Sequence, residues 1–160
     1  RYVNETDCHL AISLHNPHPE ERAAIMPAER LTPISHVLDI VRQYDWSKQR
    51  RLSFEYICWS GMNDDIAHAK QLLRLVQGLP CRVNLIRYHQ TDSDQPSCRT
   101  AASDATVLPN ATFPASDEQR MIALRDYLSA HGVTCTIRRS RGEDILAACG
   151  MLVNALNTQA

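Results

Sequence analysis

Short segments in which every second residue is apolar alternate along this chain with longer segments whose apolar residues recur at the helical period. The clearest alternating pattern covers 52–58, and a shorter one covers 133–137. The segment 10–14 is a short apolar run that suits a strand, and 81–88 is a further predicted strand. Strands that alternate with helices in this way are typical of α/β proteins with a mainly parallel sheet. We therefore predict an α/β fold in which parallel strands alternate with helices.

Two of the helical segments carry recognisable start and stop residues. We expect Thr32 to cap a helix that has Pro33 at its first position and ends near Trp46. A second helix is expected over 66–76, with Gly78 as its stop, because glycine adopts the left-handed conformation that ends many helices.

Three further helices are predicted from shorter signals. A short helix is expected over 20–26. Ser116 and Gln119 have the spacing of a capping box, which predicts a helix that stops at Gly132. The apolar residues of 145–156 are helically spaced but interrupted by Gly150, and predict a last helix or a helix broken by a turn.

The bulk composition favours one globular unit. A chain of 160 residues with 44% hydrophobic content can build a single core. Its 17 Lys and Arg balance 18 Asp and Glu, so any RNA-binding surface must come from local basic residues. With no apolar run of membrane-spanning length and no secretion signal, we expect the cytoplasm. Because the chain opens on Arg1 and polar residues follow, we interpret it as part of a longer protein.

The six cysteines are widely spaced, at positions 8, 58, 81, 98, 135 and 149. None forms a C-x-x-C pair or another chelating spacing, so we expect neither a zinc site nor an iron–sulfur cluster held by this chain. In a reducing compartment the usual fate of such a cysteine is a small buried apolar residue.

Polar residues lie at or near the carboxyl ends of the predicted strands, where parallel α/β sheets bind ligands. Ser13 and His15 follow the first strand, Glu55 lies on the second and Asn84 on the third. None of them is specific alone. His15 could be a hydrogen-bonded structural residue, Asn84 could satisfy a neighbouring backbone group, and Glu55 could face the interior or pair with an arginine.

Two segments stand apart from the strand and helix pattern. The segment 89–115 is rich in Ser, Asp, Thr, Pro and Ala and is too long for an ordinary connection, so we expect it to be functional or mobile. The segment 138–160 begins with an arginine run and contains Cys149. We treat 1–160 as one domain part that includes both.

Several motifs, taken in order, resemble one family. They are Ala11 to His15, Glu21-Arg22 with Met26-Pro27, Phe54 to Tyr56, Gly61 to Asp64, Leu79 to Ile86, and Arg138 to Ile145 with Ala147 to Gly150. Together they resemble the dual-specificity adenine methyltransferase family RlmN and its antibiotic-resistance relative Cfr. The likeness covers nearly the whole chain except 89–115, and the last motif is the most specific.

The resemblance implies a radical S-adenosylmethionine (SAM) enzyme that methylates carbon 2 of an adenine in 23S rRNA, and of an adenine in tRNA, through an S-methylcysteine intermediate. The implied fold is the C-terminal portion of a partial (β/α) radical SAM barrel. The family's C-x-x-x-C-x-x-C motif, which binds a [4Fe–4S] cluster, is absent from this sequence. The cluster ligands are therefore expected upstream, and this chain alone is expected to be inactive.

The resemblance also assigns roles to individual residues. Ser13, Leu14 and His15 match the family's SAM-contacting tripeptide, and Asn84 matches its SAM-contacting asparagine. Cys149 matches the methyl-carrying cysteine. A cysteine suits this role because carbon 2 of adenine is too electron-poor to attack SAM, whereas a thiolate is a strong enough nucleophile to accept a methyl group.

An arginine run precedes this cysteine. Arg138, Arg139 and Arg141 suit phosphate contacts that position RNA without reading its sequence. The alternative interpretation of the same run is a solvated surface turn.

Four residues depart from what the family commonly has: Asn16, Arg87, His89 and Met151 stand in place of Ala, Pro, Asn and Gln. The departures around Arg87 and His89 leave open a radical SAM Fe–S redox paralogue with another substrate. The missing cluster motif and the local arginine run leave open a non-catalytic RNA-binding fragment. A half barrel also exposes strand edges and apolar helix faces, so we expect the chain by itself to self-associate.

Overall fold

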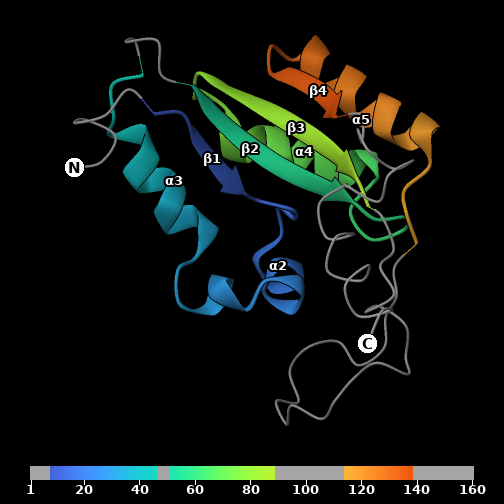
Figure 1. Cartoon of the computed structure of the whole chain (residues 1–160), viewed down its shortest axis with the longest axis horizontal. Helices are drawn as coiled ribbons and strands as arrows, with labels where there is room; N and C mark the ends of the chain where they lie inside the picture. The colour runs from blue at the N-terminus through green and yellow to red at the C-terminus, as the bar shows by residue number, and fades with distance from the viewer. Residues whose placement is uncertain (1–7, 47–50, 89–113, 139–160) are drawn as a thin grey trace, which may run out of the picture.

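The computed structural model describes residues 8–46, 51–88 and 114–138, which form one parallel sheet with flanking helices (Figure 1). The strands are β1 (Leu10–Ser13), β2 (Leu52–Cys58), β3 (Cys81–Arg87) and β4 (Thr134–Arg138), in the spatial order β1-β2-β3-β4. All three neighbouring pairs are parallel. The predicted α/β fold with parallel strands is confirmed.

Helical segments connect the strands, as parallel pairing requires. They are α2 (Pro19–Ile25), the 3-10 helix η1 (Pro27–Arg30), α3 (Ile34–Arg42), α4 (Ile66–Val76) and α5 (Glu118–Ala130). Figure 1 shows α3 beside β1, α4 along β2 and β3, and α5 beside β4. The last predicted helix, over 145–156, and the segment 89–113 lie outside the described residues.

One face of the sheet builds the core. Along β2 fully buried residues alternate with half-buried ones, so the period-two pattern separates a core face from a second face. The core face packs against the helices through side chains that are at most 1% exposed, among them Phe54, Tyr56 and Leu85 of the sheet and Leu38, Leu72 and Leu124 of the helices. Each large apolar side chain buried in this way stabilises the fold by about 1.5–3 kcal/mol.

The predicted helix stops are confirmed. Gly78 follows α4 with φ of 79°, and Gly132 follows α5 with φ of 84°. Both values lie in the left-handed region, where a residue with a side chain is strained and glycine is not. At the other end of α4, the carboxylate of Asp65 accepts a hydrogen bond from the backbone N–H of His68 at 2.9 Å.

The start of α3 differs from the prediction. Pro33 occupies the N-cap position, and Thr32 provides no cap. Glu29, which is buried in η1, accepts the backbone N–H of Ile34 at 2.9 Å and so replaces the predicted cap. The helix also ends before Trp46, whose indole N–H donates to the last turn.

The start of α5 also differs. Asp117 is the N-cap, and its Oδ1 accepts the backbone N–H of Gln119 at 2.8 Å. The predicted capping box does not form because Ser116 is fully buried and its hydroxyl donates to Asp64 Oδ2 at 2.7 Å. A tertiary partner has displaced the local one.

Arg22 ties α2 to the carboxyl end of β1. Its Nε donates to the carbonyl of Leu14 at 2.8 Å, and its Nη2 donates to the carbonyl of Ser13 at 2.9 Å. Its Nη1 pairs with the carboxylate of Glu29, which is as buried as Arg22 itself. Removing one member of a buried pair leaves the other charge uncompensated.

None of the helices in the described ranges is both long enough and apolar enough to cross a membrane.

We therefore predict that Glu29→Ala lowers the free energy of unfolding by about 3–5 kcal/mol, because the substitution strands the Arg22 guanidinium in the core. The matched control is Asp39→Ala, which breaks the salt bridge between Asp39 and Arg42. The Asp39 side chain is 69% exposed. The control should cost less than about 1 kcal/mol. Urea denaturation measures both, and equal losses would show that Glu29 is no more important than a surface carboxylate.

Candidate functional site

Four polar side chains form a row across the sheet on the face opposite the core. The register pairs Ser13 with Glu55, Glu55 with Asn84, and Asn84 with Thr136. Paired residues of adjacent strands point to the same face and lie about 5 Å apart. We call Ser13, Glu55, Asn84 and Thr136 the polar row.

Hydrogen bonds link the members of the polar row. The Thr136 hydroxyl donates to Asn84 Oδ1 at 2.8 Å, and Asn84 Nδ2 donates to Glu55 Oε1 at 2.7 Å. The hydroxyl of Ser53 also donates to Glu55 Oε1, at 3.3 Å. The second carboxylate oxygen, Glu55 Oε2, is buried and has no hydrogen-bond partner among the described residues. Such atoms are rare in folded proteins.

His15 lies just beyond Ser13, where β1 ends. Its φ is 58°, a left-handed value that is uncommon for a residue other than glycine and that recurs at functional sites. Its ring Nδ1 accepts the backbone N–H of Ile57 at 3.2 Å. In the neutral ring the proton is therefore on Nε2, which makes Nε2 a hydrogen-bond donor.

Burial, and then the positive charge of Arg22, lower the pKa of His15 to about 4, although the negative charge of Glu55 acts in the opposite direction. At neutral pH the imidazole is therefore uncharged. The site keeps a donor at this position without adding a positive charge.

Asn63 joins the ends of β1 and β2. Its Nδ2 donates to the carbonyl of His15 at 2.6 Å and to that of Ile57 at 2.7 Å, and its Oδ1 accepts the N–H of Trp59 at 2.8 Å. Asn63 is fully buried, so these bonds replace water for backbone groups that the strands leave unpaired. They hold His15 in its left-handed conformation.

Asp64 anchors the same loop to α5. Its Oδ1 accepts from Arg120 at 2.8 Å and from the backbone N–H of Gly61 at 3.0 Å, while its Oδ2 accepts from Ser116. The sequence placed Asn63 and Asp64 in a family motif and assigned them no role. Their role in the structure is to fix the loop beside the polar row.

The structure brings most of the predicted cofactor-binding residues together. Ser13 and Asn84 share the polar row, and His15 lies beside it. Leu14 differs because successive side chains of a strand point to opposite faces: it is 0% exposed and packs in the core. Glu55, which the sequence left without a role, lies between Ser13 and Asn84.

The predicted RNA-binding and catalytic residues are only partly described. Arg138 is exposed at the end of β4. In the strand register it lies opposite Ile86, on the same face of the sheet as Thr136. It therefore lies near the carboxyl edge of the sheet. Arg139, Arg141 and Cys149 lie outside the described residues.

Two of the four departures from the family pattern are described. Asn16 is fully buried; its Nδ2 donates to Glu21 Oε2 and its Oδ1 accepts the N–H of His18, both at 2.8 Å. Its side chain therefore shapes the turn into α2. Arg87 is exposed at the end of β3. His89 and Met151 lie outside the described residues.

Three of the described cysteines are poor nucleophiles. Burial raises the pKa of Cys58 far above its usual value, that of Cys81 to about 11 and that of Cys135 to about 12. Their thiols are therefore protonated at neutral pH, in a state that neither binds metal well nor attacks carbon. Within the described ranges, no three His, Cys, Asp or Glu side chains gather as a metal site.

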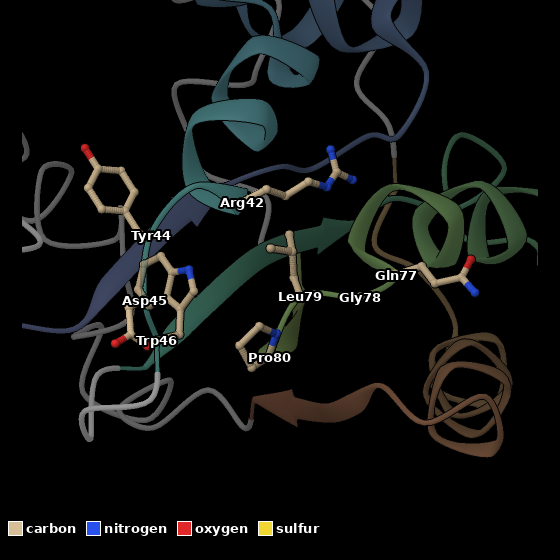
Figure 2. Close-up of a pocket in the computed structure, with 8 residues that line it drawn as sticks. All are labelled: Arg42, Tyr44, Asp45, Trp46, Gln77, Gly78, Leu79 and Pro80. Atoms are coloured by element: carbon tan, nitrogen blue, oxygen red, sulfur yellow. The ribbon is translucent and has the colours of Figure 1, made fainter.

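A surface pocket lies at the other end of the sheet (Figure 2). It is lined by Arg42, Tyr44, Asp45, Trp46, Gln77, Gly78, Leu79 and Pro80, which end α3, follow α4 or precede β2 and β3. Arg42 bridges this region by donating to the carbonyl of Leu75 at 2.8 Å. Ligands of parallel α/β sheets bind at the carboxyl ends of strands, where Ser13 and His15 lie. We therefore assign the candidate site to that end of β1 and the polar row that continues from it.

Comparison with curated proteins shows close relatives. The chain is 50% identical over 155 residues to a "Probable dual-specificity RNA methyltransferase RlmN" from Phocaeicola vulgatus, and this match covers 97% of the chain and 40% of the relative. It is 39% identical over 143 residues to a "Dual-specificity RNA methyltransferase RlmN" from Campylobacter hominis, covering 89% and 35%. The chain thus spans less than half the length of these relatives. No family model matches it.

Solved structures agree with the sequence comparison. A radical SAM methyltransferase from Sphaerobacter thermophilus superposes with a TM-score of 0.73 at 36% identity, covering 89% of this chain and 37% of that one. A domain of pyruvate-formate lyase-activating enzyme from Bacteroides vulgatus superposes with a TM-score of 0.60 at 13% identity, covering 86% and 71%. The second likeness concerns the fold alone.

The difference between two histidines tests the electrostatics of the site. His68 is partly buried, which lowers its pKa, but hydrogen bonds to Glu21 and Asp65 outweigh this effect and raise the pKa overall. We predict that His15 stays neutral until the pH falls toward 4, while His68 gains its proton above pH 6.5. Histidine ring signals in an NMR titration measure both values, and a His15 midpoint near 6.5 would contradict the prediction.

The same shift fixes the sign of a stability effect. The folded pKa of His15 is below the unfolded value of 6.5, so the unfolded chain binds more protons between pH 6.5 and 4. The contribution of neutral His15 is complete above pH 6.5 and is lost as the pH falls through this window. His15→Gln should therefore flatten the stability profile between pH 6.5 and 4, as urea midpoints would show.

Proposed function

We propose, from the homology of this chain to the C-terminal part of RlmN-type radical SAM methyltransferases, that the whole protein methylates carbon 2 of an adenine in 23S rRNA and of an adenine in tRNA. The premise is 50% identity across 97% of the chain to a relative whose name states RNA methyltransferase activity. Because the chain spans only 40% of that relative, the activity is proposed for the whole protein. Such an activity would be exercised in the cytoplasm, where these RNAs are found.

The observation that carries this proposal is that Ser13 and Asn84 lie in the same polar row, on either side of Glu55. They come from different strands, and the family resemblance matches each of them to a SAM contact. A hydroxyl, an amide and the neutral imidazole of His15 offer both donors and acceptors, which suits the ribose, base and amino-acid groups of SAM. The residues present therefore fit the cofactor.

The uncharged state of His15 also suits SAM. The sulfonium of SAM is positively charged, and a protonated imidazole beside it would repel it. Burial and Arg22 keep His15 neutral at physiological pH, so it can donate a hydrogen bond from Nε2 without that repulsion. When bound, SAM and a [4Fe–4S] cluster supply the methyl group and the carbon-centred radical chemistry, with cluster ligands expected upstream of this chain.

We assign the methyl carrier to Cys149. Its thiolate sulfur would attack the methyl carbon of one SAM, so that a new S–CH₃ bond forms while the sulfonium C–S bond breaks and S-adenosylhomocysteine leaves. The arginines Arg138, Arg139 and Arg141 would contact RNA phosphates. Arginine suits this role because its planar fork stays charged and binds phosphate with two donors.

The test is the mass of the Cys149 peptide from full-length protein produced with its cluster and SAM supply. We expect the S-methylated peptide, and an unmodified Cys135 peptide in the same digest, because the Cys135 thiol is buried and protonated. Cys149→Ala should abolish adenine methylation of 23S rRNA in a primer-extension assay. An unmodified Cys149 in protein that still cleaves SAM would reject the methyl-carrier role in favour of a redox reaction.

We also propose that the chain by itself self-associates. Within the described sheet, β1 and β4 are edge strands with a neighbour on one side only. Exposed edges of this kind recruit other strands. Light scattering should show a mass above that of a monomer for the 160-residue chain, and less self-association for the full-length protein. A stable monomer of the 160-residue chain would argue against the proposal.

A further inference from the structure

One atom at the centre of the polar row is left unused by the fold. Glu55 Oε2 is buried and has no hydrogen-bond partner among the described residues, although the other oxygen, Oε1, accepts from both Asn84 and Ser53. A carboxylate that needed only to hold its neighbours would not have to bury a second oxygen without a partner. A buried acceptor in this state is costly, and in native proteins such violations concentrate at functional or strained sites.

The position of Glu55 shows which ligand could use this oxygen. The register places it between Ser13 and Asn84, the two residues of the proposed SAM site that share the polar row. An ionised carboxylate only accepts hydrogen bonds, so the complementary ligand group must be a donor. SAM has three kinds of donor: the ribose hydroxyls, the ammonium group of its methionine part and the exocyclic amino group of its adenine.

We propose that Glu55 is a SAM-binding residue of this site, whose Oε2 accepts a hydrogen bond from a hydroxyl, amino or ammonium donor of the cofactor. The inference rests on the proposed function, since it takes SAM as the ligand. Its second consequence concerns Asn84, whose amide is held from both sides by Glu55 Oε1 and by the Thr136 hydroxyl. One N–H of that amide remains for the ligand, in an orientation that the polar row fixes.

The test is Glu55→Gln in the full-length protein, with S-adenosylhomocysteine as the titrated probe in calorimetry. The glutamine keeps the shape of the side chain and an oxygen that accepts from Asn84. It replaces Oε2 with an NH₂ group, which is itself a donor and cannot accept a hydrogen bond from the ligand. We expect binding to weaken at least about 10-fold, the scale of a lost charge-assisted hydrogen bond. Glu55→Asp, which keeps the charge but withdraws it by one methylene, should weaken binding as well.

Thermal unfolding separates a binding role from a structural one. A neutral amide is less costly to bury than an unpartnered carboxylate, so the melting temperature of ligand-free Glu55→Gln should equal or exceed that of the wild type. A residue whose only task is to hold Asn84 would show no loss of affinity for the probe in Glu55→Gln, because the glutamine oxygen can still accept from Asn84. The matched control is Asp126→Asn, which makes the same chemical change at an exposed carboxylate and should alter neither quantity.

A second probe identifies the donor. 5′-Methylthioadenosine keeps the adenosine but lacks the amino-acid part. An equal loss of affinity for both probes therefore assigns a donor of the adenosine part, and a loss confined to S-adenosylhomocysteine assigns the ammonium group. Wild-type affinity for both probes in a folded Glu55→Gln protein would overturn this inference and leave the proposed function intact. Wild-type protein that bound neither probe would overturn the proposed function and this inference with it.

Discussion

The parallel register between the strands is the constraint on which both the core and the candidate site depend. It aligns Phe54 with Val83 on the core face, and Glu55 with Asn84 one position further on the other face. A slip of one residue would turn Phe54 away from the helices and push the Glu55 carboxylate into the core. The apolar packing that stabilises the sheet therefore also specifies the polar row, because the two share one backbone alternation.

Buried polar residues at the carboxyl edge convert this aligned sheet into a rigid site. Arg22 binds the last carbonyls of β1, Asn63 links the ends of β1 and β2, and Asp64 fixes the following loop to α5. Each is buried and each bonds groups that would otherwise need water. Together they hold His15 in an unfavourable backbone conformation, while burial and the charge of Arg22 keep its ring neutral. Fixed groups of this kind are what binding sites require.

Local signals predicted the elements well and their starts less well. The strands, the glycine stops and most helix bounds follow from periodicity and backbone freedom, which act within a few residues. The caps predicted at Thr32 and Ser116 failed because tertiary partners compete for the same groups: Glu29 reaches the start of α3 across a turn, and Ser116 bonds Asp64 from a distant loop. Resemblance to a family supplied the proposed SAM-binding residues, which no spacing rule could have identified.

The sequence by itself determined the α/β fold, the burial of one strand face and the identity of Ser13, His15 and Asn84 as candidates, since periodicity and motif are both written in the order of residues. Only the tertiary structure decided that Leu14 belongs to the core and that Glu55 joins the site. A glutamate on a strand can face an arginine, water or a ligand. Which of these it meets depends on neighbours that the register brings together from distant parts of the chain.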